Sequence, residues 1–117
     1  MTRNNAAIAE AYYTAWGKKN IADMEKFLHP DVRVKGPLDE TIGKAAVIEA
    51  LKKFASIFKS LTIRSKFQSE NQAMLAIDMD FPAPIGTLRT ASLLTFQDGL
   101  IVNVELFFDT RSFGTKG

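Results

Sequence analysis

The sequence predicts an α+β fold in which three helices cover one face of a bent, largely antiparallel sheet. Three observations support this class. Apolar residues recur at helical spacing in the first half of the chain, they alternate at strand spacing in the second half, and glycine, proline and asparagine separate the segments. The expected order is helix, helix, strand, helix and then four strands. Helices that precede most of the sheet must pack together on its apolar face, which makes a cone.

The composition predicts a single domain over residues 1–117, because a chain of this length with 46% hydrophobic residues can bury one core. The absence of cysteine excludes disulfide scaffolds, thiol catalysis and cysteine zinc sites. A formal net charge of +2 is too small to indicate nucleic-acid binding. No signal peptide or membrane-spanning run is recognisable, so we expect a cytoplasmic protein without a membrane partner.

Three helices are expected before residue 60. The first spans residues 5–16, Asn20 can cap the second, and Pro30 prevents the second from continuing beyond His29. The third follows Gly43. The apolar positions of the three helices are, in order, Ile8, Tyr12, Ala15 and Trp16; Ile21, Met24, Phe27 and Leu28; and Val47, Leu51, Phe54 and Phe58.

Five strands are expected from alternating apolar and polar residues. Leu61, Ile63 and Phe67 should share the inner face of one strand, and Asp98 with Gly99 is typical of a tight hairpin turn. The expected strands span residues 31–36, 61–68, 75–81, 88–96 and 101–109.

Matching the apolar faces across the hairpins sets Arg64 opposite Asp78, Asp80 opposite Arg89, and Arg89 opposite Asp109. A carboxylate, arginine and carboxylate in a row can orient and activate water. The alternation nevertheless places this row on the outer face of the sheet. A structural row of ion pairs, contributing ~0.2 to 1 kcal/mol per pair, is therefore the favoured interpretation.

Several short segments carry a family resemblance by their order along the chain. They are residues 12–16 (YYTAW), 27–32 (FLHPDV), 36–37 (GP), 43–47 (GKAAV), 96–102 (FQDGLIV) and 106–109 (LFFD). In this order they resemble SnoaL-like proteins of the nuclear transport factor 2-like (NTF2-like) superfamily. The resemblance implies a cone with a ligand cavity between sheet and helices, often within a homodimer. The superfamily includes ketosteroid isomerases, polyketide cyclases, dehydratases, epoxide hydrolases and non-catalytic binding modules, so the fold alone does not decide the function.

The catalytic patterns of two such enzyme groups transfer poorly to this sequence. Ketosteroid isomerases use a tyrosine, a carboxylate base and a protonated carboxylic acid. Tyr12 matches the tyrosine, but the base position falls at Gly36 and the acid position at about Ser92. The last-strand aspartate of limonene-type epoxide hydrolases corresponds to Leu106. The resemblance therefore disfavours both reactions.

Tyr12 and His29 are the candidate catalytic residues. His29 is the only histidine, and an unperturbed imidazole titrates near neutral pH. Its expected place at the end of the second helix favours a structural role, because a histidine there complements the helix dipole. A single histidine excludes multi-histidine metal sites, and no glycine-rich phosphate loop is present. We therefore expect neither a metal nor a cofactor.

The candidate ligand site is the interior of the cone. Strand parity turns the hydroxyls of Thr90 and Ser92 inward, and Tyr12 and Trp16 project together from the first helix. An apolar cavity with three hydroxyls suits a small hydrophobic molecule that carries a carbonyl or hydroxyl group. The expected lining residues are Tyr12, Trp16, Phe54, Phe58, Met79, Phe81, Thr90, Ser92, Leu106 and Phe108.

Two functions remain open on the sequence. One is binding of such a molecule, with or without isomerase, cyclase or hydrolase activity. The other is a non-catalytic homodimeric binding or interaction module whose own side chains fill the cone. Leu93 and Phe107 fall on the outer sheet face, and large apolar groups there predict a homodimer through that face.

Overall fold

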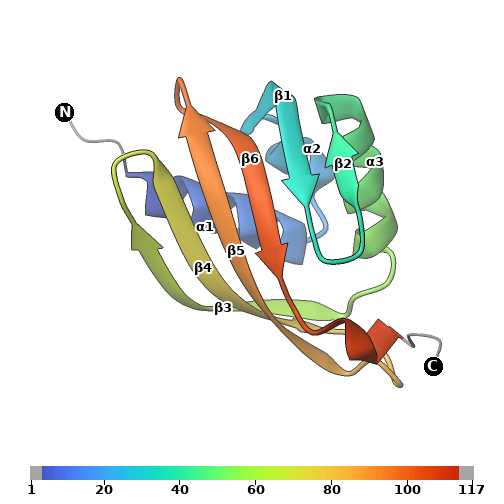
Figure 1. The fold of residues 1–117 in the computed structure, drawn as a ribbon. Coiled ribbons are helices and arrows are strands. Elements are labelled where there is room, and N and C mark those ends of the chain that lie inside the picture. Colours follow the sequence, from blue (N-terminus) through green and yellow to red (C-terminus); the bar gives the residue numbers. More distant parts are fainter. Residues whose placement is uncertain (1–3, 114–117) are drawn as a thin grey trace.

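The computed structural model describes residues 4–113, in which three α-helices pack on one face of a six-stranded sheet (Figure 1). The strand order is β2-β1-β6-β5-β4-β3; β1 and β6 are parallel and all other neighbours are antiparallel. This is the α+β class that the sequence predicts. The elements are α1 (Asn5–Gly17), α2 (Ile21–Glu25), β1 (Leu28–Lys35), β2 (Glu40–Ile42), α3 (Lys44–Ala55), β3 (Ser60–Gln68), β4 (Gln72–Asp80), β5 (Thr87–Gln97), β6 (Leu100–Phe107) and the 3-10 helix η1 (Thr110–Phe113).

The hydrophobic core lies between the helices and the inner face of the sheet, which is the face that the helices cover. In Figure 1, α1 lies behind β4, β5 and β6, and α3 lies beside β1 and β2. Buried residues alternate with partly exposed ones along the whole of β4, as the sequence predicts. None of the helices in residues 4–113 combines the length and the apolar character needed to cross a membrane.

The second helix is shorter than expected. It ends at Glu25, and β1 begins at Leu28, so His29 and Pro30 belong to a strand. Leu28 is fully buried and pairs with Ile101 of β6, after which the register shifts before pairing resumes at residue 33. Proline cannot donate to a strand ladder, which accounts for the irregularity. The expectation of helix up to His29 was wrong because burying Leu28 in the sheet outweighed continuing the helical pattern.

The short strand β2 was not predicted. Its three residues pair with the end of β1, after a turn in which the Gly36 amide donates to the Asp39 carbonyl at 2.9 Å. A three-residue strand is too short to show alternation in the sequence. The chain then passes through Gly43, whose φ of 95° favours glycine, and enters α3.

A β-bulge at Arg64 corrects the predicted inner face of β3. Ile63 pairs with Ile77, but Ser65 pairs with Ala76, so one extra residue stands in β3. The residues after the bulge therefore exchange faces. Phe67, which was expected inside, lies on the outer face with 66% of its surface exposed. The inner positions are taken by Lys66 and Gln68, which bind α1. Lys66 pairs with Glu10 at 2.6 Å, and the side-chain oxygen of Gln68 accepts from the Ala6 amide at 2.8 Å.

The expected row of Asp80, Arg89 and Asp109 does not form. Arg89 stands opposite Asp78, two residues from its predicted partner, and is exposed. The carboxylate of Asp80 instead accepts from the hydroxyls of Thr87 at 2.6 Å and Ser60 at 3.1 Å. Asp109 lies beyond the end of β6, where the guanidinium of Arg111 binds it and lowers its pKa to about 2. A slip of two residues keeps every side chain on its face, so the assignment of these residues to the outer side was right although the register between β4 and β5 was wrong. The pairing of Ala91 with Phe107 follows the register predicted between β5 and β6, but the recorded pairs end there and do not reach Arg89 and Asp109.

The predicted contact between Arg64 and Asp78 is present as an ion pair, with 3.7 Å between Nη1 and Oδ1. The backbone partner of Asp78 is Thr62, because the bulge displaces Arg64 from the ladder. The side chain of Arg64 is 52% exposed, so the pair contributes little to stability.

Candidate functional site

The interior of the cone contains a cavity of about 60 Å³, which we call the Thr90 cavity. Side chains from α1, α3 and three neighbouring strands enclose it. Its lining residues are Tyr13, Trp16, Phe54, Ile77, Met79, Phe81, Leu88, Thr90, Leu106 and Phe108.

A second cavity of about 140 Å³, the Asp39 cavity, adjoins the first near the turn between β1 and β2. The two cavities share the side chains of Trp16, Phe54, Leu106 and Phe108. The other residues that line the Asp39 cavity are Val34, Gly36, Leu38, Asp39, Thr41, Val47, Ala50 and Leu51.

The structure gathers seven of the ten expected lining residues around the Thr90 cavity. Three expected residues do not line it, namely Tyr12, Phe58 and Ser92. Phe58 is 2% exposed and packs edge-on against Trp16, with 5.1 Å between ring centroids, so it belongs to the core behind the cavity wall. The seven that line the cavity are Trp16, Phe54, Met79, Phe81, Thr90, Leu106 and Phe108.

The tyrosine that lines the cavity is Tyr13 rather than Tyr12. Both rings are buried, but only Tyr13 lines the cavity, and its hydroxyl lies 2.6 Å from the Ser92 hydroxyl oxygen. Burial raises the pKa of Tyr13 to about 12, although the hydrogen bond with Ser92 opposes the shift. The phenol is therefore protonated at neutral pH and available as a donor. The sequence offers the pair Tyr13 and Trp16 at a spacing of three, which is as compatible with one helical face as the spacing of four.

Thr90 has the most informative polar atom in the cavity. The residue is 8% exposed, and its hydroxyl oxygen is buried without a hydrogen-bond partner among the described residues. A buried hydroxyl that lacks a partner costs free energy. The residues that line the cavity are otherwise largely apolar, so a bound molecule can supply the hydrogen-bond partner that the Thr90 hydroxyl lacks.

Asp39 was missed in the sequence, although it is the sole charged residue among the described residues that line the two cavities. It stands in the turn between β1 and a strand too short to be recognised from the sequence. Because that strand was not predicted, the alternation of apolar and polar residues did not indicate on which face of the sheet Asp39 would lie. The signal that was present is the pair Gly36 and Pro37, which marks a turn close to the end of β1.

His29 lines neither cavity. It lies in β1, and its Nδ1 accepts from the amide of Asp31 at 3.0 Å. The expected interaction with a helix dipole is absent, because α2 has already ended at Glu25. Within residues 4–113, no group of three or more histidine, aspartate or glutamate side chains is arranged to hold a metal ion.

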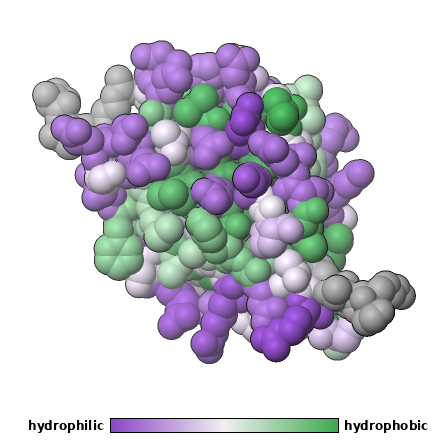
Figure 2. Space-filling view, in the orientation of Figure 1, coloured by the Kyte–Doolittle hydropathy of each residue, from purple (hydrophilic) through white to green (hydrophobic). Residues whose placement is uncertain are grey.

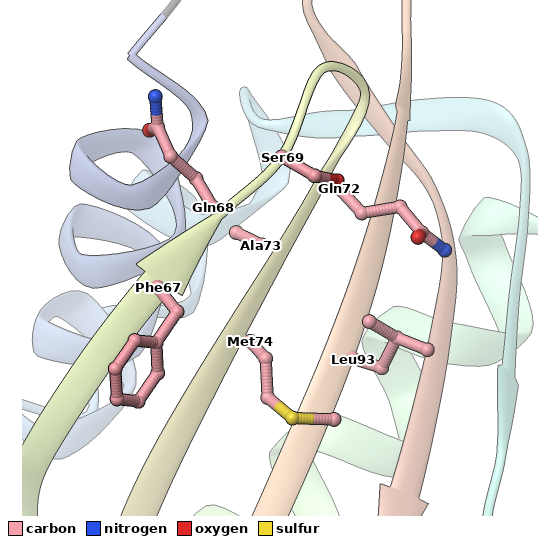
Figure 3. Close-up of a pocket in the computed structure, with 7 residues that line it drawn as sticks. All are labelled: Phe67, Gln68, Ser69, Gln72, Ala73, Met74 and Leu93. Carbon is pink, nitrogen blue, oxygen red and sulfur yellow. The ribbon is translucent and has the colours of Figure 1, made fainter.

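The outer face of the sheet has a groove of about 220 Å³ across β3, β4 and β5. Figure 3 shows the side chains of Phe67, Met74 and Leu93 standing on these three neighbouring strands. Figure 2, in the same orientation as Figure 1, shows hydrophobic residues gathered in the middle of this face between hydrophilic residues above and below. Phe107 of β6 adds a ring that is 45% exposed.

Comparisons with solved structures identify the fold. An NTF2-like protein of unknown function from Cytophaga hutchinsonii superimposes with a TM-score of 0.84 at 18% identity, over 97% of this chain and 96% of that one. TerC, co-crystallised with polyporic acid, has a TM-score of 0.79 at 20% identity over 93% and 94% of the chains. A protein from Kribbella flavida provisionally described as a ketosteroid isomerase has a TM-score of 0.79 at 19% identity, over 92% and 79%.

The sequence comparison adds the family. No curated protein matches the chain significantly. The family model of the SnoaL-like domain, however, matches residues 9–104, which include every helix and strand from α2 to β5 and most of α1 and β6. The chain therefore belongs to the SnoaL-like domain family, and its fold is the NTF2-like cone.

Proposed function

We propose that this protein binds a small, largely apolar organic molecule in the Thr90 cavity and recognises it through a carbonyl or hydroxyl group. The observation that carries the proposal is the Thr90 hydroxyl, which is buried, belongs to a residue that lines an apolar cavity and has no partner among the described residues. The co-crystallisation of TerC with polyporic acid supports it, because that protein has a similar fold.

The pair of Tyr13 and Ser92 supplies a donor for such a ligand. The two hydroxyls carry two protons, and their mutual hydrogen bond uses one of them. When Ser92 donates to Tyr13, the phenolic proton is free for a ligand carbonyl in the cavity. This arrangement would stabilise negative charge that develops on a carbonyl oxygen, as isomerase or cyclase chemistry requires. A reaction of this kind also needs a proton acceptor, and Asp39 is the carboxylate that lines the adjoining cavity.

The substitution Thr90→Val tests the proposal with two effects of opposite sign. Valine has nearly the same shape and removes the unpaired hydroxyl, so the free energy of unfolding should rise by about 1 kcal/mol. Binding of a carbonyl or phenolic ligand should weaken about fivefold, because the hydrogen bond to Thr90 is lost. Urea unfolding measures the first effect. A thermal-shift screen of small carbonyl and phenolic compounds followed by calorimetry measures the second.

Thr95→Val is the matched control on the same strand. Thr95 lies on the outer face, where its hydroxyl oxygen accepts from the Gln72 side chain at 3.1 Å. The control should lose a little stability and leave ligand binding unchanged. Equal ligand affinity in the wild-type protein and in Thr90→Val would exclude Thr90 as the recognition group.

We also propose, on a separate observation, that the protein forms a homodimer through the outer face of the sheet. Phe67, Met74, Leu93 and Phe107 lie on that face, and exposed apolar patches of this kind are typical of interfaces. A second copy related by a two-fold axis would cover each patch with the same patch. This interaction is compatible with ligand binding, because the cavities lie on the other side of the sheet.

Light scattering at micromolar concentration should give twice the chain mass of 13.0 kDa. Leu93→Glu should return the protein to a monomer, because a buried unpaired carboxylate is costly at an interface. Ile57→Glu is the control, since Ile57 is 46% exposed and lies between α3 and β3, away from the outer face. A wild-type mass of one chain would refute the dimer.

A further inference from the structure

The Asp39 cavity has a feature that ligand recognition at Thr90 does not involve. Its walls are largely apolar, yet one carboxylate-bearing residue lines it, and no lysine, arginine or histidine does among the described residues. Asp39 is exposed, so the carboxylate keeps access to solvent while it borders an apolar space. A carboxylate in such a position favours the binding of cationic molecules over that of neutral or anionic ones.

Strand parity turns Asp39 toward this cavity. Val34 pairs with Thr41, and both line the Asp39 cavity. Asp39 stands two residues before Thr41 and therefore shares its face. The residue opposite Asp39 is Gly36, which also lines the cavity and adds no side chain to it; a Cβ there would make ordinary van der Waals contact with the Phe108 ring at 3.7 Å. The turn thus places a carboxylate and an open space side by side.

The basic residues near Asp39 do not neutralise it. Arg33 pairs with Glu40, with 3.6 Å between Nη1 and Oε2. Lys35 stands opposite Glu40 and so projects from the other face of the hairpin. None of the ion pairs formed by residues 4–113 includes Asp39. Its charge is therefore available to a ligand.

We propose that Asp39 binds a cationic group, and that the ligand is an elongated apolar amine with a hydroxyl or carbonyl group at its far end. This inference rests on the proposed function, because the far end is the group that Thr90 recognises. The two cavities share four side chains, including Phe54 and Leu106, and this proximity is the basis for proposing one molecule that extends along both. An alkylammonium group stays protonated at neutral pH and supplies the charge.

The probes are 4-alkylphenols with two to four methylene groups and the same phenols with a terminal amine. Calorimetry at low ionic strength should show that the best amine binds roughly three- to tenfold more tightly than its neutral counterpart. The preference should shrink in 0.5 M salt, because Asp39 is exposed and salt screens exposed charges. The chain length that binds best reports the separation of the two recognition groups.

Two variants separate Asp39 from general surface charge. Asp39→Asn keeps the size and the turn preference of the side chain and should abolish the preference for the amine. Glu40→Gln removes the neighbouring carboxylate, which faces away from the cavity, and should retain the preference. Loss of the preference in Glu40→Gln to the same extent as in Asp39→Asn would overturn the assignment.

The remaining outcomes distinguish this inference from the function on which it rests. Equal affinities of the amines and the neutral phenols in the wild-type protein would overturn the role of Asp39 and leave binding at Thr90 in place. If neither series binds, and no compound of the carbonyl and phenol screen binds, both proposals fail.

Discussion

Replacing Phe58 with alanine should lower the free energy of unfolding by about 3 to 5 kcal/mol, the usual cost of truncating a buried phenylalanine. Phe58 is 2% exposed and packs between Trp16 at 5.1 Å and Phe81 at 6.4 Å, measured between ring centroids. The Lys19 ammonium lies 4.0 Å from the ring centroid and donates to the Phe58 carbonyl. The ring therefore joins α1, the end of α3 and the sheet. Urea unfolding measures the loss directly, and the melting temperature should fall by on the order of 15 °C.

Phe54→Ala is the control for this prediction. Phe54 is 38% exposed and borders both cavities, so its truncation removes fewer contacts and opens a space that already exists. We expect a loss of about 1 kcal/mol. Equal losses for the two variants would show that Phe58 does not anchor the core.

Tyr13→Phe should cost about 1 to 3 kcal/mol, although it removes only one oxygen atom. The Ser92 side chain is fully buried, and its hydroxyl would lose its 2.6 Å partner. The double variant Tyr13→Phe with Ser92→Ala should be less destabilised than the sum of the single variants, since it removes both members of the pair. Unfolding of the four proteins in urea gives the coupling energy, which we expect to be about 1 to 2 kcal/mol.

The same variants test the role of Tyr13 in recognition. Tyr13→Phe should weaken binding of a carbonyl ligand, whereas Tyr12→Phe should not, because Tyr12 does not line either cavity. Strictly additive losses of stability in the Tyr13 and Ser92 cycle would show that the two hydroxyls act independently. An effect of Tyr12→Phe alone on ligand affinity would return the role to that residue.

The class of the fold and most of the cavity wall could be read from the sequence, because alternation along a strand is a local property. Thr90 faces inward because antiparallel pairing puts it on the same face as the apolar residues of β4, such as Ile77, and that holds in any register displaced by an even number of residues. The slip that separates Asp80 from Arg89 therefore changed an ion pair and left the wall of the cavity intact. The helices could be predicted for the same reason, because the spacing of their apolar residues determines which face packs on the sheet.

Other features depended on contacts between distant segments. The bulge at Arg64 exposes Phe67 and brings Lys66 to Glu10 on α1. The pattern of β3 does not show this bulge, because its apolar residues Leu61, Ile63 and Phe67 alternate regularly and therefore indicate one uninterrupted inner face. The end of α2 likewise depended on the pairing of Leu28 with Ile101, which is distant in the sequence.

The sequence by itself determined the α+β cone, the inward side of each long strand from β4 to β6, and an apolar interior with hydroxyl groups. The tertiary structure decided which tyrosine reaches that interior and that Asp39 borders it. Tyr12 and Tyr13 are both buried, so helical periodicity did not indicate which of them lines the cavity. The hydrogen bond between Tyr13 and Ser92 of β5, which holds the Tyr13 ring in place, is a tertiary contact. Asp39 borders the site because the three-residue strand β2 that follows it pairs with β1. This strand is held by its backbone hydrogen bonds to β1, and three residues are too few to show a strand pattern in the sequence.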